Sequence, residues 1–224
     1  MEIWKKTRNW SLKYFDKIYL DFGAKFDKLY FESQTAAPGV KTVKSLLKRK
    51  LAKISDSAVI VELSDKDNLG NFLILKSDGT PLYSTKDLGL VEMEFKDFKP
   101  DRIIHVVAQE QDLYFRQLFE TFKLVNKSWA EKSKHLSYGL VILKSGKMSS
   151  REGDVILYDD LLEELEKKAL ELASNKDKPE SRQTAKDIAL AAIKYAMLKI
   201  DSSKTITRPC MFAITGVSAR AECR

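Results

Sequence analysis

The feature of this sequence that most constrains its fold is a continuous apolar run followed by a polar turn and an amphipathic helix. Residues 102–108 form the run, which is typical of a strand buried on both faces of a parallel sheet. The polar residues 109–112 follow, and apolar side chains then recur with helical spacing from Leu113 to Phe122. A strand, turn and helix in this order place ligand-binding groups at the strand's carboxyl end. We therefore expect an α/β fold with a doubly wound, mostly parallel sheet.

Hydrophobic periodicity predicts further elements on both sides of this unit. The expected strands are residues 26–31, 58–63, 72–76 and 135–143, and the expected helices are residues 3–22, 43–54, 83–99, 159–172 and 185–200. The Pro38-Gly39 pair predicts a break at residues 36–39, and Asp78-Gly79 predicts a hairpin turn because glycine supplies a positive φ. Thr85 is a candidate cap for its helix. Residues 43–54 would present a basic, solvated outer face.

Composition limits the class of protein. The 224 residues are 44% hydrophobic and 32% charged, which is typical of a soluble globular chain. The net charge of +7 favours a polyanionic partner only weakly, because the basic residues are spread along the chain. No apolar run approaches the ~20 residues of a membrane span. Cys210 and Cys223 have no metal-ligand spacing, so we expect a reduced, cytoplasmic setting and no metal site built from protein ligands.

A loop at residues 147–153 carries the strongest candidate for phosphate chemistry. It follows an apolar run and a Ser145-Gly146 turn, and it contains Lys147, Met148, Ser149, Ser150 and Arg151 before Gly153. Cations, hydroxyls and a glycine that allows close backbone approach suit a polyphosphate ligand. A solvated basic loop explains the same residues, so the motif needs a second constellation beside it.

Four polar clusters follow apolar strands or open helices, and they form that constellation. They are Glu32-Ser33, Tyr83 with Asp87, residues 109–111, and the Lys147 loop. In a doubly wound sheet such positions converge at the carboxyl edge, where ligands bind. Tyr83 and Asp87 are four residues apart and share one face of a helix. Each residue taken alone is better explained as a turn or helix-entry residue, so the hypothesis depends on their joint order.

With these clusters in this order, the chain resembles the second half of the catalytic domain of arginyl-tRNA synthetases, a class I aminoacyl-tRNA synthetase family. The resemblance extends over residues 1–206, and its motifs are specific in combination. The matching stretches are residues 31–34 (FESQ), 77–88 (SDGTPLYSTKDL), 100–113 and 147–153 (KMSSREG). The resemblance implies ATP-dependent activation of L-arginine, with Mg²⁺ accompanying the ATP, and transfer of arginine to tRNA(Arg).

The resemblance also implies roles for individual residues. Glu32 and Asp87 would face the arginine guanidinium, Tyr83 would contact the bound amino acid, and Gln111 would hold its polar groups. The ATP site would include His135, Lys147, Met148, Ser149 and Ser150, with Lys147 and Arg151 as catalytic cations. These assignments are what the family pattern predicts for matching positions.

Several positions depart from the family pattern. Ser150 stands where a second lysine is usual, which leaves Arg151 as a substitute cation. Lys86 replaces an arginine, and Ala108 replaces a frequent glycine. The family's H-I-G-H loop needs two histidines three residues apart, whereas this sequence has only His105 and His135. We therefore expect the chain by itself not to activate arginine.

These observations predict three segments. Residues 1–176 would belong to the catalytic nucleotide-binding domain, 177–206 would be the first helix of an all-α anticodon-binding domain, and 207–224 would be an atypical tail. That tail is either unrelated sequence or a short C-terminal extension. We expect a monomer without membrane contact. The alternative function is a non-catalytic synthetase remnant that binds a ligand, RNA or a protein.

Overall fold

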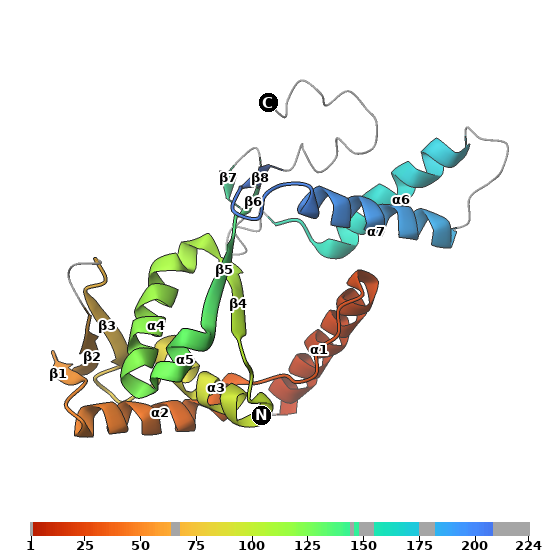
Figure 1. Ribbon diagram of the computed structural model, residues 1–224. Helices are drawn as coiled ribbons and strands as arrows, with labels where there is room; N and C mark the ends of the chain where they lie inside the picture. Colours follow the sequence, from red (N-terminus) through yellow and green to blue (C-terminus); the bar gives the residue numbers. More distant parts are fainter. Residues whose placement is uncertain (1, 64–67, 144–145, 148–154, 175–181, 208–224) are drawn as a thin grey trace. The chain divides into compact units, whose positions relative to one another are not determined.

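The computed structural model describes residues 2–63, 68–143, 146–147, 155–174 and 182–207. The chain divides into two compact units, which Figure 1 shows with their elements labelled. One unit is Lys28–Tyr138, and the other combines Met1–Asp27 with Gly139–Arg224. Each has a hydrophobic cluster of its own.

The unit Lys28–Tyr138 combines helices with two small sheets. Strands β1, β2 and β3 form an antiparallel sheet, whereas β4 and β5 pair in parallel, with Ile103 opposite Ser133 and Ala108 opposite Tyr138. The parallel pair confirms the strand, turn and helix unit on which the fold prediction depended. The elements in chain order are α2 (Glu32–Lys48), β1 (Lys53–Ser55), β2 (Ala58–Glu62), β3 (Asn71–Leu75), α3 (Tyr83–Phe98), β4 (Ile103–Ala108), the 3-10 turn η2 (Gln109–Gln111), α4 (Asp112–Val125), α5 (Lys127–Lys132) and β5 (Ser133–Tyr138).

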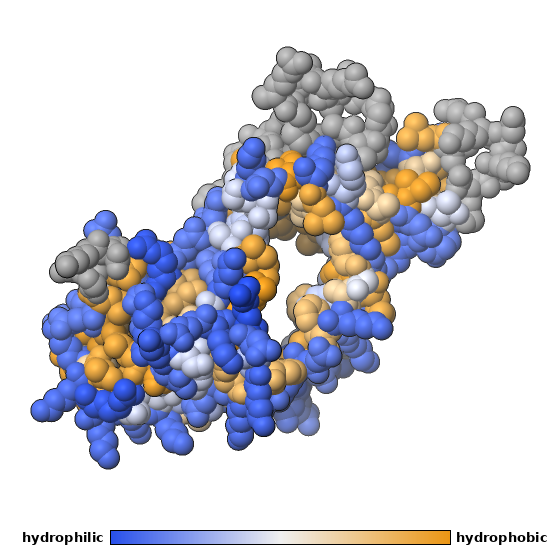
Figure 2. Space-filling model, in the orientation of Figure 1, coloured by the Kyte–Doolittle hydropathy of each residue, from blue (hydrophilic) through white to orange (hydrophobic). Residues whose placement is uncertain are grey.

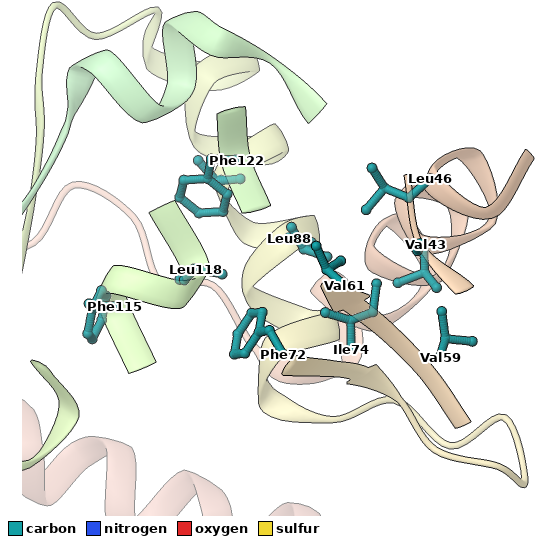
Figure 3. Packing of buried hydrophobic residues seen from close by; sticks show 12 residues of the cluster. Val43, Leu46, Val59, Val61, Phe72, Ile74, Leu88, Phe115, Leu118 and Phe122 are labelled. Carbon is teal, nitrogen blue, oxygen red and sulfur yellow. The ribbon is translucent and has the colours of Figure 1, made fainter. Parts of the chain in front are cut away.

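The core of this unit joins the antiparallel sheet to helices α2, α3 and α4, as Figure 3 shows. Aliphatic side chains from α2 and the sheet meet Leu88 of α3, and Leu118 and Phe122 continue the cluster along α4. Burial of such side chains is the main favourable term in folding, at roughly 1.5–3 kcal/mol for each large residue. The hydrophobic residues of this core without solvent exposure are Val43, Leu46, Val61, Ile74, Leu88 and Phe122.

Helices α2 and α3 pack with their backbones in direct contact. A Cβ atom added to Gly39 would lie 1.9 Å from the Thr85 carbonyl oxygen, and one added to Gly89 would lie 2.1 Å from the Thr35 carbonyl oxygen. The predicted break at residues 36–39 is therefore wrong, because Pro38 and Gly39 both lie inside α2. Gly39 serves a close helix contact rather than a turn, and tertiary packing overrides its local preference.

Other boundaries also differ from the sequence prediction. Residues 26–31 form no strand, and α2 begins directly after them at Glu32. The helix expected at residues 43–54 ends at Lys48, so its last residues enter β1. The strand expected at residues 135–143 is two strands, β5 and β6 (Val141–Leu143), which belong to different sheets. Apolar content alone does not reveal where a strand changes partners.

The parallel sheet is covered on one face only. Ile103 and Val107 pack against the core, whereas Ile104 and Val106 are 53% and 60% exposed. The expectation that this strand is buried on both faces is therefore wrong for the part of the chain that the structure describes. The alternation arises because successive side chains point to opposite faces and α4 lies against only one of them.

The basic outer face of α2 is exposed to solvent, as predicted. Lys44 and Lys48 of α2 are exposed, as are Arg49 and Lys50 directly after the helix, and hydrophilic residues follow the lower edge of this unit in Figure 2. The apolar positions Val43 and Leu46 point the other way, into the core. This helix is therefore amphipathic, with a solvated charged face.

The second unit, Met1–Asp27 with Gly139–Arg224, is built around a helix pair. Helices α6 (Tyr158–Ser174) and α7 (Arg182–Leu198) enclose Leu162, Leu165, Ala189, Leu190 and Ile193. The unit also contains α1 (Glu2–Phe22) and a sheet in the order β7 (Gly146–Lys147), β6 and β8 (Ile206–Thr207).

Polar contacts hold α1 against α6 and α7. Tyr158 donates its hydroxyl hydrogen to Asp21 at 2.8 Å, and the Lys186 ammonium lies 2.6 Å from the same carboxylate. One turn away on α1, Lys17 pairs with Asp159 at 3.0 Å. Two salt-bridged carboxylates therefore fix the C-terminal part of α1.

Candidate functional site

A cavity of about 590 Å³ lies between α3, β4 and α4 in the unit Lys28–Tyr138. Three of the predicted arginine-binding residues line it: Tyr83, Asp87 and Gln111. Most other lining residues are apolar, and a largely apolar pocket with a few convergent polar groups is the usual form of a small-molecule site. They are Leu90, Val91, Val107, Phe115, Leu118 and Phe122.

The first turn of α3 is anchored to the antiparallel sheet. Ser84 donates to the Leu73 carbonyl at 2.6 Å, and the buried Thr85 hydroxyl donates to the Ile74 carbonyl. The predicted N-cap role of Thr85 is wrong, because α3 begins at Tyr83 and its N-cap is Leu82. From the third position of the helix, the Thr85 oxygen instead accepts from the Leu82 N–H at 2.9 Å. These bonds fix the direction of the turn that carries Tyr83 and Asp87.

The turn before α3 has the predicted conformation but a different connection. Gly79 adopts φ +78°, and Asp78 accepts from the Thr80 N–H at 2.8 Å. The turn leads from β3 into α3, so the expected hairpin is wrong. The β2–β3 hairpin is instead closed upstream, by a segment that includes Gly70, whose φ is +56°.

Asp87 is the central polar group of the cavity. Its carboxylate accepts a hydrogen bond from the Tyr114 hydroxyl on α4. Burial raises the pKa of Asp87, the hydrogen bond from Tyr114 opposes this, the nearby Glu32 charge adds to it, and Lys86 opposes it. A partly buried carboxylate of this kind has a strong preference for a cationic partner.

Glu32 lies near Asp87 but does not line the cavity. It is the first residue of α2, its side chain is 63% exposed, and its carboxylate forms a salt bridge with Lys86. The same ammonium lies 5.4 Å from the centroid of the Tyr83 ring. Lys86 thus connects two predicted arginine-binding residues, and its charge partly neutralises Glu32.

His135 lies behind the cavity wall rather than in the lining. Its ring stacks on Phe115 with 4.4 Å between centroids, and Nε2 lies 3.0 Å from the Val107 carbonyl oxygen. Nδ1 lies 3.4 Å from the Asp112 carboxylate. Both ring nitrogens therefore have partners on the wall formed by β4 and α4.

Three polar residues of the cavity were missed by the sequence prediction: Glu94, His105 and Tyr114. Glu94 Oε2 and His105 Nε2 are buried and have no hydrogen-bond partner among the described residues. Burial, helped by the Asp87 charge, raises the pKa of Glu94 to about 7. Burial, helped by His135, lowers the pKa of His105 to about 4.

Two of these omissions had a signal in the sequence. Glu94 follows Asp87 by seven residues on α3, and Tyr114 follows Gln111 by three. Residues at these intervals lie on the same face of a helix, so the predicted pocket could have been extended along α3 and α4.

The loop predicted to bind phosphate is described only at its beginning. Lys147 ends β7, in the other unit, where β7 pairs antiparallel with β6. Met148, Ser149, Ser150 and Arg151 lie outside the described residues. Their predicted roles are therefore proposals.

The described residues contain no group of three or more His, Cys, Asp or Glu side chains arranged to hold a metal ion. Among the described helices, none has the length and apolar character needed to cross a bilayer.

The fold and the matched residues place the chain in a family of class I synthetases. A family model described as the catalytic domain of class I tRNA synthetases (R) matches residues 1–207, so the chain belongs to this family. The resemblance and the α/β fold class predicted from the sequence are confirmed.

The relatives are arginine–tRNA ligases. That of Porphyromonas gingivalis is 37% identical over 214 residues, which are 92% of this chain and 36% of the relative. That of Flavobacterium psychrophilum is 38% identical over 214 residues, which are 92% of this chain and 35% of the relative. The chain therefore spans about a third of the length of the curated relatives it matches.

Solved structures agree on the fold. The arginyl-tRNA synthetase of Plasmodium falciparum superposes with a TM-score of 0.73 at 22% identity, covering 97% of this chain and 37% of that one. The Thermus thermophilus enzyme gives a TM-score of 0.66 at 22% identity, covering 85% and 39%. The predicted boundaries at residues 176 and 206 remain predictions, since the family model runs through both.

Proposed function

We propose that this chain supplies the amino-acid pocket and one phosphate-binding loop of an arginine–tRNA ligase. The enzyme would activate L-arginine with ATP and Mg²⁺ and transfer it to tRNA(Arg). The observation that carries the proposal is that Tyr83 and Asp87 of α3 line one cavity of about 590 Å³ together with Gln111, which lies 24 residues after Asp87 in sequence. This volume suits a small ligand such as an amino acid.

The charges of the cavity favour a guanidinium. Asp87 and Glu94 are both acidic, and no lysine or arginine is among the described residues that line the pocket. A guanidinium presents planar donors that match a carboxylate in a bidentate fork. Asp87 would take this contact, Tyr83 would lie against the ligand's stem, Gln111 would bind its polar groups, and Glu32 would add negative charge nearby.

The ATP site would depend on the loop that begins at Lys147. Lys147 and Arg151 would stabilise charge on the rearranging phosphates, a role exerted mainly in the transition state. Met148, Ser149 and Ser150 would complete the loop around ATP. His135 would act indirectly, by supporting the wall formed by β4 and α4. We propose a cytoplasmic monomer without membrane contact.

The pocket is tested by Asp87→Asn in this chain completed with the segments of an arginine–tRNA ligase that it does not span. Loss of one partner of a buried, charge-assisted contact costs on the order of 2–5 kcal/mol, so arginine should bind at least ~30-fold more weakly while ATP affinity stays constant. Asp97→Asn is a matched control, because Asp97 lies on the same helix but is exposed and pairs with Lys28. Unchanged arginine affinity in calorimetry would remove Asp87 from the pocket.

The loop is tested by Lys147→Ala, with the exposed Lys204→Ala as its control. A transition-state contact of this kind contributes ~3–4 kcal/mol, so arginine-dependent ATP–pyrophosphate exchange should slow by two to three decades, with a much smaller change in the KM for arginine. A wild-type rate would favour the non-catalytic alternative for this loop.

A further inference from the structure

Tyr114 is tied to the central carboxylate of the cavity by a direct hydrogen bond. It lies on α4 and donates its hydroxyl hydrogen to Asp87 Oδ2 on α3. The Tyr114 ring makes edge contacts with Phe72, at 5.6 Å between centroids, and with Phe115, at 5.5 Å. These aromatic contacts restrict the ring, so the position of its hydroxyl is set by the core.

We propose that Tyr114 is a positioning residue, which fixes one oxygen of Asp87 so that the other oxygen faces the cationic end of the ligand. This inference rests on the proposed function, because it assigns Asp87 to a guanidinium. A carboxylate has two oxygens and about four lone-pair directions, and a hydrogen bond to one oxygen leaves the second free for a ligand. Tyr114 thus acts through Asp87 and needs no contact with the reacting atoms.

Charged groups of both signs surround Asp87, so the hydrogen bond from Tyr114 matters for the ionisation of its carboxyl group. Glu32 from α2 and Glu94 from α3 add negative charge, while Lys86 from α3 adds positive charge that is shared with Glu32. His105 from β4 lines the same cavity, and its lowered pKa keeps it neutral near pH 7. The Tyr114 hydroxyl donates a hydrogen bond to Asp87, and this bond favours the ionised carboxylate.

The main variant is Tyr114→Phe, which removes one oxygen atom and keeps the ring contacts. Hydrogen bonds to charged groups are strong enough that arginine affinity should fall ten- to a hundredfold at pH 7. The loss should grow as the pH is lowered, because the Asp87 carboxyl then takes up a proton more readily. Tyr30→Phe is the matched control, since Tyr30 also donates to an aspartate, Asp97, away from the cavity.

A double-mutant cycle separates positioning from general damage. In an Asp87→Asn background, Tyr114→Phe should change arginine affinity by less than twofold, because Tyr114 acts through Asp87. Equal losses in both backgrounds would overturn the proposal and indicate a structural role. If Asp87→Asn weakens arginine binding but Tyr114→Phe does not, the positioning role fails and the proposed function stands.

A second measurement does not need arginine. Carboxyl NMR titration of this chain should show a higher Asp87 pKa in Tyr114→Phe than in the unmodified protein, with no change at Asp97. An unchanged Asp87 pKa would overturn the inference, whatever the outcome of the binding experiment. If arginine affinity is insensitive to Asp87→Asn, the proposed function fails, and the titration alone decides whether Tyr114 controls Asp87.

Discussion

Glu94 should make the stability of this protein depend on pH in an unusual direction. Burial raises its pKa from 4.5 to about 7 in the folded state, with a further contribution from Asp87. Between these values the folded chain holds a proton that the unfolded chain releases, so stability falls as the pH rises from about 4.5 to about 7. Most carboxylates, whose folded pKa is lowered, have the opposite effect.

The size of the expected change in stability follows from the shift in the pKa of Glu94. A displacement of about 2.5 pKa units corresponds to roughly 3 kcal/mol of unfolding free energy as an upper bound. Solvent still reaches part of the side chain, so we expect about 1–2 kcal/mol after allowing for screening. Glu94→Gln keeps the shape and removes the charge, and it should stabilise the protein by this amount at pH 8 and hardly at all at pH 4.5.

His105 acts in the opposite sense and must be separated from Glu94. Its pKa falls from 6.5 to about 4, so the stability of the neutral, buried imidazole is lost as the pH falls through this range. The two windows overlap, and in the unmodified protein their slopes partly cancel. The Glu94→Gln and His105→Gln variants should therefore show slopes of opposite sign between pH 4.5 and 6.5.

The assay is urea unfolding at several pH values, followed by Trp129 fluorescence. Trp129 stacks on Phe95 at 5.8 Å in the same unit as Glu94, and a Trp4→Phe/Trp10→Phe background leaves it as the single tryptophan. Glu163→Gln, at an exposed position on α6, is the control. If the difference between Glu94→Gln and its background is the same at pH 4.5 and pH 8, the reasoning from burial is refuted.

Three further changes test how the fold positions the site. Gly89→Ala would force a Cβ atom to within 2.1 Å of the Thr35 carbonyl oxygen, so we expect ~2–4 kcal/mol of destabilisation in denaturant titrations and a matching loss of arginine affinity. Leu118→Ala removes a fully buried side chain beside the cavity and should cost about 2–5 kcal/mol without changing the pH profile. Asp21→Asn breaks the contact with Lys186, and hydrogen exchange should increase in α1 while α4 stays protected.

Local patterns were sufficient to predict the elements that carry the site. The spacing of Tyr83 and Asp87 placed both on one helical face, and the position of Gln111 after an apolar strand placed it at the carboxyl end of β4. Each inference uses residues within one element or one turn. The structure brings all three together in one cavity, although their roles in binding remain predictions.

Features that depend on distant residues were not accessible in this way. Gly39 was interpreted as part of a break because its partner, Thr85, lies 46 residues away in sequence. His105 sits among apolar positions of β4, and nothing local shows that its side chain enters a cavity. In these cases packing between elements determines the conformation and the chemistry, and a single sequence does not encode that packing as a short-range pattern.

Of the proposed substrates, tRNA is a polyanion and arginine is a cation. We expect the charges of the protein to act on tRNA over longer distances and on arginine at contact. The chain has a net charge of +7, with a basic outer face on α2, which favours a polyanion such as tRNA over longer distances. A cationic amino acid would be repelled by the same average charge. Salt screens that repulsion beyond a Debye length of roughly 8 Å, whereas the partly buried Asp87 and Glu94 act on a ligand at contact, where screening is weak. A basic surface and an acidic pocket are therefore compatible, and raising the ionic strength should weaken tRNA binding far more than arginine binding.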